Sequence, residues 1–464
     1  MKKISLYVVF LPLLFLVLST CTQNKTGPLR VCSENPRYFT DGSGKAIYLT
    51  GSHTWNNLVD MSTDDPPEAF DFDGFLNWAK GYNHNFFRLW TWELVQWNTG
   101  ANSGQANPVI HTVSPLPYER TGPGLALDGK PKFDLTRFNP EYFERLRNRT
   151  VKAGEQGFYV SVMLFEGWGL QRIKGAFFNH PYHPENNING INGDLNGDSL
   201  GLEIHTLADS ARLSIQKDYV RKVIETVNDL DNILFEISNE NHPPSAEWQY
   251  HMIDYIHELE SQMPKQHPVG MTFQFKGGSN RTLFDSPADW ISPNGAGGYK
   301  DDPPAGDGSK VILTDTDHLG GIWGNQKWVW KSFLRGLNPI FMDPYDAIVL
   351  ESRYEPGWEE PVRKSMGYTL DFAKRINLID MVPDNELAST GYCLAEKGTE
   401  YLIYLPEGKD VTVDLSDASG DLSVEWFNPN SNETEYSENI PGGEVQSLQS
   451  PFGEDDAVLY LKAK

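Results

Sequence analysis

The sequence predicts an α/β protein, a (β/α)8 barrel followed by a small all-β sandwich. Eight apolar runs, spread over about 330 residues, alternate with segments of helical period. Strands that alternate with helices form right-handed parallel units, and eight such units close into a barrel. From about Ser389 the helical period is lost, and short strands separated by Gly, Pro, Asp and Asn predict a sandwich. A doubly wound sheet is less favoured, because no glycine-rich phosphate turn follows the first strand.

The barrel elements are expected in strict chain order. Strands are predicted at residues 46–51, 85–92, 157–164, 233–241, 269–275, 290–294, 311–314 and 338–345. Helices are predicted at residues 71–82, 142–156, 210–230, 248–262, 323–334 and 361–376. A loop at 173–206 is unusually long for a compact domain, and such loops are usually functional. We assign residues 37–385 to the barrel and 386–464 to the sandwich.

Residues 233–241, with the sequence ILFEISNEN, are central to the prediction. A strand buried on both faces of a parallel sheet is apolar throughout, and only Glu236 interrupts this run. Asn239 and Glu240 follow at its carboxyl end, where α/β barrels place their chemistry. We expect Glu240 to be a catalytic carboxylic acid and Asn239 to contact a sugar. The plain alternative is a strand that stops at a polar loop.

The N-terminus has the pattern of an export signal. Two lysines precede an apolar run at residues 6–18 that is short for a membrane span. The sequence LSTC at 18–21 resembles a bacterial lipoprotein box, with threonine where Gly or Ala is more usual. We expect residues 1–20 to be removed, Cys21 to be lipidated and residues 21–36 to form a tether. The expected location is the bacterial cell envelope, as an outer-membrane lipoprotein.

Charge and aromatic content limit the class of ligand. The formal net charge of −24 argues against nucleic acid as a partner, and more weakly against an anionic polysaccharide. The chain has 13 Trp, 20 Tyr and 24 Phe, and exposed aromatic faces stack on sugar rings, although a large barrel also buries many. Cys32 and Cys393 could pair in an oxidising compartment, and buried free thiols are an equal alternative. The sequence does not indicate an oligomeric state.

Two further acids make glycosidic chemistry a specific hypothesis. Glycoside hydrolysis typically uses two carboxyl groups that flank the scissile bond. Glu240 follows the fourth predicted strand, and Asp315 and Asp317 follow the seventh. We favour Asp315 as the second acid. Alternate residues of a strand face the same side, so the sequence does not separate Asp315 from Asp317.

These residues resemble those of the glycoside hydrolases of the (β/α)8 clan that contains cellulases and β-galactosidases. The chain is most similar to the apiosidase-like branch, which carries a C-terminal β domain, over about residues 28–464. The resemblance rests on the Asn239-Glu240 pair, on Arg88 in the second strand and on the acidic end of the seventh. It implies that Glu240 is the general acid/base, that Asn239 contacts the sugar 2-hydroxyl and that Arg88 orients the nucleophile.

The seventh strand departs from the pattern of the clan, which usually has Glu where this chain has Asp315. Aspartate is shorter by one methylene, so its carboxylate is set back. Retaining enzymes hold their two carboxyl groups about 5–5.5 Å apart, and inverting enzymes about 6.5–9.5 Å. Three alternatives therefore stay open: a shifted backbone, inversion with Asp315 as the base, or Asp317 as the nucleophile.

Other residues that follow the predicted strands are candidates for substrate binding. They are His53, Trp55, Trp92, Glu166, Trp168, His242, His318 and Asp343, and each could equally be a rim or core residue. No cofactor or metal site is expected. Residues 194–205 begin like a calcium loop, but Ser199 stands at the glycine position and His205 at the final acidic position.

The sequence thus predicts an exported glycoside hydrolase that acts on a plant or algal polysaccharide and is anchored to a membrane by lipid. The competing hypothesis is a non-catalytic glycan-binding lipoprotein on a degenerate barrel, which Asp315 in place of Glu keeps open. A third, a protein–protein scaffold, predicts an exposed apolar patch on the β module. The sugar, the linkage and the stereochemical outcome do not follow from the sequence.

Overall fold

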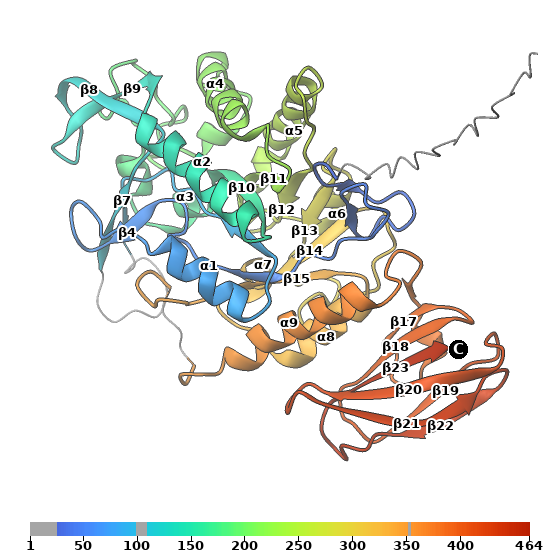
Figure 1. Cartoon of the computed structure of the whole chain (residues 1–464). Helices are drawn as coiled ribbons and strands as arrows, with labels where there is room; N and C mark the ends of the chain where they lie inside the picture. Colours follow the sequence, from blue (N-terminus) through green and yellow to red (C-terminus); the bar gives the residue numbers. More distant parts are fainter. Residues whose placement is uncertain (1–25, 99–108, 351–353) are drawn as a thin grey trace, which may run out of the picture.

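A computed structural model describes the chain over residues 26–98, 109–350 and 354–464. Within these ranges the chain forms a parallel barrel with helices around it and a C-terminal β-sandwich (Figure 1). The predicted fold class is confirmed. The predicted signal peptide at residues 1–20 and the predicted lipidation site Cys21 lie outside the described residues.

The barrel consists of eight parallel strands whose order around the ring follows the sequence. The first strand, β3, meets the second, β5, where the Asn85 backbone N–H donates to the Thr50 carbonyl oxygen at 3.1 Å. Glycine is needed at Gly51, because a Cβ there would lie 2.1 Å from the Phe86 carbonyl oxygen. The strands are β3 (Gly51–His53), β5 (Phe86–Leu89), β10 (Tyr159–Glu166), β11 (Ile233–Asn239), β12 (Val269–Thr272), β13 (Trp290–Ser292), β14 (Val311–Asp315) and β15 (Asn338–Met342).

Amphipathic helices cover the outside of the barrel. In α1, for example, Asp71 caps the first turn by accepting from the Gly74 N–H, and the apolar residues at helical spacing are buried. The sixth connection, residues 293–310, contains no helix. Among the described helices, none is long and apolar enough to cross a membrane. The helices are α1 (Phe72–Gly81), α2 (Pro140–Glu155), α3 (Trp168–Arg172), α4 (Ser210–Val227), α5 (Ala246–Glu260), α6 (Asn280–Phe284), α7 (Thr316–Gly320), α8 (Gln326–Leu334) and α9 (Glu360–Arg375).

Two small antiparallel sheets, which the sequence did not predict, extend the loops of the barrel. The β8–β9 hairpin projects from the side of α2 in Figure 1. Its first strand, YERTGPGL, contains the Gly and Pro residues that normally mark turns, and these obscure the strand pattern. The strands are β4 (Asp60–Ser62), β6 (Gln96–Asn98) and β7 (Ile110–Ser114) in one sheet, and β8 (Tyr118–Leu125) and β9 (Pro131–Phe138) in the other.

The described part of the predicted tether, residues 26–36, is packed against the rest of the protein. Leu29, Cys32 and Asn35 are buried, and the Asn35 amide donates to two backbone carbonyls near residue 380. The prediction of a tether was wrong for this part, because β1 (Arg30–Val31) pairs with β2 (Phe39–Thr40). Cys32 and Cys393 are buried free thiols.

The C-terminal sandwich consists of a six-stranded and a two-stranded antiparallel sheet. Val411 and Val413 of β19 point into the core between the sheets, and the intervening residues are exposed. The polar strands β21 and β22 were not predicted, because β21 is exposed along almost its whole length. The strands are β16 (Val382–Pro383), β17 (Cys393–Glu396), β18 (Glu400–Leu405), β19 (Asp410–Asp414), β20 (Asp421–Asn428), β21 (Glu433–Pro441), β22 (Val445–Gln449) and β23 (Ala457–Ala463).

The sandwich packs against α8 and α9 of the barrel through an aromatic core (Figure 1). The Trp330 ring of α8 stacks on Tyr404 of β18, with ring centroids 6.0 Å apart. Phe372 of α9 lies 5.6 Å from both Trp330 and Phe427 of β20. This core joins two units that the sequence treats as separate.

Candidate active site

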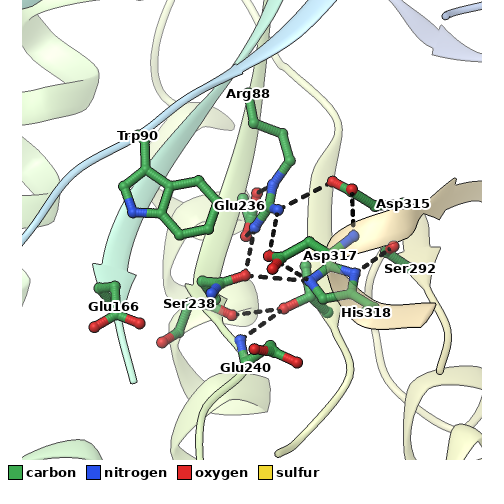
Figure 2. A network of polar contacts seen from close by, with 12 residues as sticks. Arg88, Trp90, Glu166, Glu236, Ser238, Glu240, Ser292, Asp315, Asp317 and His318 are labelled. Atoms are coloured by element: carbon green, nitrogen blue, oxygen red, sulfur yellow. Dashed lines mark hydrogen bonds and ion pairs between the residues drawn. The ribbon is translucent and has the colours of Figure 1, made fainter. Parts of the chain in front are cut away.

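A buried polar network centred on Arg88 fills the mouth of the barrel (Figure 2). The guanidinium donates to both carboxylate oxygens of Glu236, at 2.9 and 2.6 Å. It also donates to Asn239 Oδ1 at 2.6 Å, to Asp315 Oδ2 at 3.0 Å and to Asp317 Oδ2 at 3.1 Å. Burial alone would lower the pKa of Arg88, but the surrounding carboxylates raise it above its usual value. Arg88 is therefore a permanent cation that orders four acceptors.

Glu236 is the member of this network that the sequence reasoning missed. A buried charge is costly unless it is paired and hydrogen-bonded. Arg88 and Glu236 are the single charged residues of two buried strands, β5 and β11. That coincidence was the available signal, because each of these charges requires a partner inside the barrel.

Asp315 is the last residue of β14, and its carboxylate is fully engaged. His53 Nε2 lies 3.1 and 2.9 Å from its two oxygens, and Arg88 contacts Oδ2. Oδ1 also accepts from the Asp317 backbone N–H at 3.0 Å, so Asp315 caps α7. Burial by itself would raise the pKa of Asp315, but His53 and Arg88 hold it well below its usual range. Asp315 is a fixed anion with 1% of its surface exposed.

Asp317 has a different environment, because the chain turns into α7 directly after Asp315. The alternation expected for a strand therefore does not apply to it. One of its oxygens accepts from Arg88, and 8% of its surface is exposed. Burial raises the pKa of Asp317 to about 6. The positive charge of Arg88 opposes this shift in pKa, and the negative charge of Asp315 adds to it. Of the two aspartates, Asp317 is the one with a carboxylate oxygen left without a hydrogen bond from the described residues.

Glu240 follows β11 in a left-handed backbone conformation, with φ of 40°. Its N–H donates to Thr272 Oγ1 at 3.3 Å, and its carbonyl accepts from Gln171 Nε2 at 2.8 Å. Non-glycine residues rarely adopt this conformation, which is common at functional sites. The backbone of Glu240 is thus held by two neighbouring segments.

The Glu240 carboxyl group has no hydrogen bond from any described residue, and no dashed line reaches it in Figure 2. Only 6% of the residue is exposed. Burial raises the pKa of Glu240 well above its usual value, and the charges of Asp317 and Glu166 raise it further. Its environment therefore favours the protonated form, and Asp317 is the neighbouring charge with the largest effect on it.

Glu166 ends β10 beside this group. Its carboxylate accepts from the Trp168 and Gly169 backbone N–H groups, at 2.7 and 2.9 Å, and burial raises its pKa to about 8. Its own backbone N–H donates to Glu93 Oε2 at 2.9 Å. Glu166 thus lies next to the Arg88 network without a hydrogen bond to it (Figure 2).

His318 was predicted to bind substrate, but both of its ring nitrogens face the protein. Nδ1 lies 2.7 Å from Ser292 Oγ, and Nε2 lies 3.1 Å from Asn239 Oδ1. Asp343 was another candidate, and the structure does not bring it to the site. It is fully buried and forms a bidentate ion pair with Arg363 of α9.

The predicted tryptophans pack against one another at the edge of the site. The Trp55 ring lies 5.5 Å from Trp92 and 5.2 Å from Trp168. Trp92 is fully buried, whereas Trp168 retains a small exposed area. His242 is also nearly buried, and its Nε2 donates to the Leu202 carbonyl oxygen of the long loop at 2.7 Å. These residues shape the mouth, and Trp168 is the tryptophan of the three with the most exposed surface.

No set of three or more His, Cys, Asp or Glu side chains in the described ranges is arranged to hold a metal ion. The acids of the mouth are instead satisfied by Arg88, by His53 and by backbone N–H groups. The arrangement places a buried acid that can donate a proton, Glu240, near a carboxylate that can act as a nucleophile or base, Asp317.

Fold and site together define a (β/α)8-barrel protein with a packed β-sandwich and a buried group of carboxyl groups at the mouth. Two family models match parts of the chain. Residues 109–276 match a model described as "Domain of unknown function (DUF6298)". Residues 379–462 match a model described as "Putative collagen-binding domain of a collagenase". No curated protein matches the chain.

Solved structures with the same fold are similar over nearly the whole chain. One is described as a glycoside hydrolase, with a TM-score of 0.60 and 14% identity, and the match covers 94% of this chain and 97% of that chain. Another is a glycoside hydrolase family 5 protein from Bacteroides vulgatus ATCC 8482, also with a TM-score of 0.60 and 14% identity, over 94% of this chain and 95% of that chain. At this identity the similarity establishes the fold, barrel and appended domain together.

Proposed function

We propose that this protein is a glycoside hydrolase that cleaves O-glycosidic bonds with two carboxyl groups. The observation that carries the proposal is the Glu240 carboxyl group, which is buried, free of hydrogen bonds from described residues and held in its protonated form by burial and by the charge of Asp317. Glycoside hydrolysis requires this combination of a protonated acid and an ionised carboxylate. The glycoside hydrolases that share the fold are consistent with it.

In the proposed reaction, Glu240 donates its proton to the leaving glycosidic oxygen as the bond to the anomeric carbon breaks. Its raised pKa favours the protonated form that this step needs. Asp317, ionised above about pH 6 and oriented by Arg88, attacks the anomeric carbon or removes a proton from the attacking water. Asp315, which the sequence favoured for this role, would instead hold His53 and Arg88 in place.

Asn239 would contact the sugar 2-hydroxyl from a position fixed by Arg88. The substrate we propose is a plant or algal polysaccharide, reached from the bacterial cell envelope. The lipoprotein-like sequence at residues 18–21 supports that location. A lipid anchor at Cys21 is part of the proposal.

A non-catalytic glycan-binding protein is the second candidate. It is favoured by Asp315 at the end of β14, where the glycoside hydrolases of the clan usually have glutamate, and by the small exposed area of Glu240 and Asp317. A binder retains affinity for glycans and shows no turnover, so activity measurements separate the two functions.

The test compares the parent protein with Glu240→Gln on a panel of aryl glycosides and on plant and algal polysaccharides. We expect the variant to lose about 10²- to 10⁴-fold in kcat, because it cannot donate the proton. Glu247→Gln, the same change at an exposed site on α5, is the matched control and should hydrolyse like the parent. Equal rates for Glu240→Gln and the parent would remove the acid/base assignment. Binding without turnover in the parent would favour the second candidate.

A further inference from the structure

We propose that Ser292 and His318 are positioning residues that hold the Asn239 side-chain amide with its N–H donors turned toward the substrate. The inference deepens the proposed function and rests on it. The geometry behind it is a chain of short contacts from β13 through α7 to β11, in which the donor Arg88 at one end fixes the hydrogen-bonding role of each atom.

The Arg88 guanidinium can only donate hydrogen bonds. Its Nη2 lies 2.6 Å from one terminal atom of the Asn239 amide, so this atom is the oxygen, Oδ1. His318 Nε2 lies 3.1 Å from the same oxygen. An oxygen accepts, so Nε2 must carry a hydrogen and donate it.

A neutral imidazole carries a proton on only one of its two nitrogens. With the proton on Nε2, Nδ1 of His318 must accept. Its partner at 2.7 Å is the Ser292 hydroxyl, which can donate. The Ser292 hydroxyl, which can also accept, must therefore donate to Nδ1, and this hydrogen bond supports the tautomer of His318 that donates to Asn239.

His318 has to be neutral for this chain to hold. The charged and titratable groups around it are Asp317, whose Oδ2 is 3.7 Å from Nε2, together with Arg88, Asp315 and His53. Burial, with the positive charge of Arg88, lowers the pKa of His318 to about 3. The ring thus stays neutral over the pH range in which the protein would work.

These contacts hold the Asn239 amide in one orientation. Because Oδ1 accepts from both Arg88 and His318, a flipped amide would place its own N–H groups against two donors. The observed orientation is therefore strongly preferred, and Nδ2 of Asn239 donates no hydrogen bond to any described residue. It is available to a sugar hydroxyl. Pre-organised donors of this kind need no reorientation when the substrate binds.

The first test needs no activity. In protein labelled with ¹⁵N-histidine, we expect one imidazole that remains neutral and Nε2-protonated between about pH 5 and 8. The signal is assigned by its loss in His318→Gln. A charged imidazolium, or the tautomer protonated on Nδ1, would overturn the proposal. This result is independent of whether the protein hydrolyses glycosides.

The second test is a double-mutant cycle on the hydrolysis of whichever glycoside the parent cleaves. His318→Phe removes the donor and keeps the aromatic shape, and we expect kcat to fall by about fivefold to tenfold with less change in KM. His318→Gln can still donate and should restore most of the loss. In an Asn239→Ala background, His318→Phe should have almost no further effect.

Two outcomes of this cycle would contradict the proposed chain of hydrogen bonds from Ser292 through His318 to Asn239. One is an equal loss from His318→Phe with and without Asn239, and the other is a Gln variant as slow as the Phe variant. Thermal unfolding of each variant identifies effects of misfolding. A parent protein that shows no turnover while its ¹⁵N signals match the expected tautomer would refute the proposed function. The proposed chain of hydrogen bonds to Asn239 would still stand.

Discussion

At the scale of single residues, the three carboxylates around Arg88 are distinguished by the other groups that bind them. Arg88 contacts Glu236, Asp315 and Asp317, yet these three carboxylates differ in what else they bind. Glu236 is saturated by Arg88, and Asp315 by Arg88, His53 and a backbone N–H. Among the described residues Asp317 accepts one such bond, from Arg88, which is why we propose it and not Asp315 as the reacting carboxylate.

The pKa of Asp317 gives a prediction for the pH dependence of activity. A nucleophile or base must be ionised, and burial raises the pKa of Asp317 to about 6. We expect kcat/KM to be high above this pH and to fall as the pH drops through about 6, with tenfold loss per unit further below. Glu240 deprotonates at higher pH, so a second, alkaline decline is expected. The measurement is a pH–rate profile on an aryl glycoside.

Substitution separates the two aspartates. Asp317→Asn should abolish hydrolysis with little change in Tm. Asp315→Asn should mainly lower Tm, because it removes a buried anion from His53 and Arg88 and costs about 3–5 kcal/mol. An Asp317→Asn variant with parental activity would return the catalytic role to Asp315.

At the scale of elements, one carboxylate contacts both ends of the long loop between β10 and α4. Glu93, just after β5, lies 3.4 Å from His180 Nε2 and 3.1 Å from His205 Nε2. These histidines stand near the start and the end of the loop, at η2 (Ala176–Asn179) and η3 (Leu202–His205). A single side chain therefore holds both ends of a loop that the sequence marked only as long.

Removal of this charge should loosen the loop. Burial alone would raise the pKa of Glu93, but His205 and His180 hold it at about 2. The stabilisation is thus present above about pH 4.3, the usual pKa of Glu, and is lost as the pH falls toward 2. For Glu93→Gln we expect faster amide hydrogen exchange at residues 176–205 at neutral pH. Glu185→Gln, at an exposed site in the same loop, is the control, and equal exchange in both variants would argue against the clamp.

At the scale of the whole molecule, barrel and sandwich share one aromatic core. Trp330, Phe372, Tyr404 and Phe427 come from both units and are buried against one another. The Arg375–Glu425 ion pair adds a polar contact beside them. The sandwich is therefore a structural part of the protein and not a module on a flexible linker.

Trp330→Ala tests this coupling. The loss of a fully buried indole at the junction should cost about 3–5 kcal/mol and lower the unfolding temperature of both units together. Calorimetry and circular dichroism should show one cooperative transition. Tyr436→Ala, at an exposed site on β21, should leave the unfolding temperature unchanged. Two separate transitions, with one unaffected by Trp330→Ala, would contradict a shared core.

Much of the architecture was predictable because its causes are local. Periodic apolar residues mark α1 and α9, and continuous apolar runs mark β10 and β11, whatever lies around them. The polar strand β21 and the Gly- and Pro-containing strand β8 were missed, because their pairing depends on neighbours and not on their own composition.

The sequence by itself determined the barrel, the strand ends at which polar residues meet and the place of Glu240 at one of these ends, because these depend on hydrophobic period and chain order. Only the tertiary structure decided that Asp317 keeps a carboxylate oxygen without a hydrogen bond from the described residues. It also decided that Asp315 and Asp343 form ion pairs and that His318 faces Asn239. The physical reason is that a buried polar atom takes its role from its nearest partner. Arg88 and Asp315, for instance, are neighbours in space although 227 positions separate them in the chain.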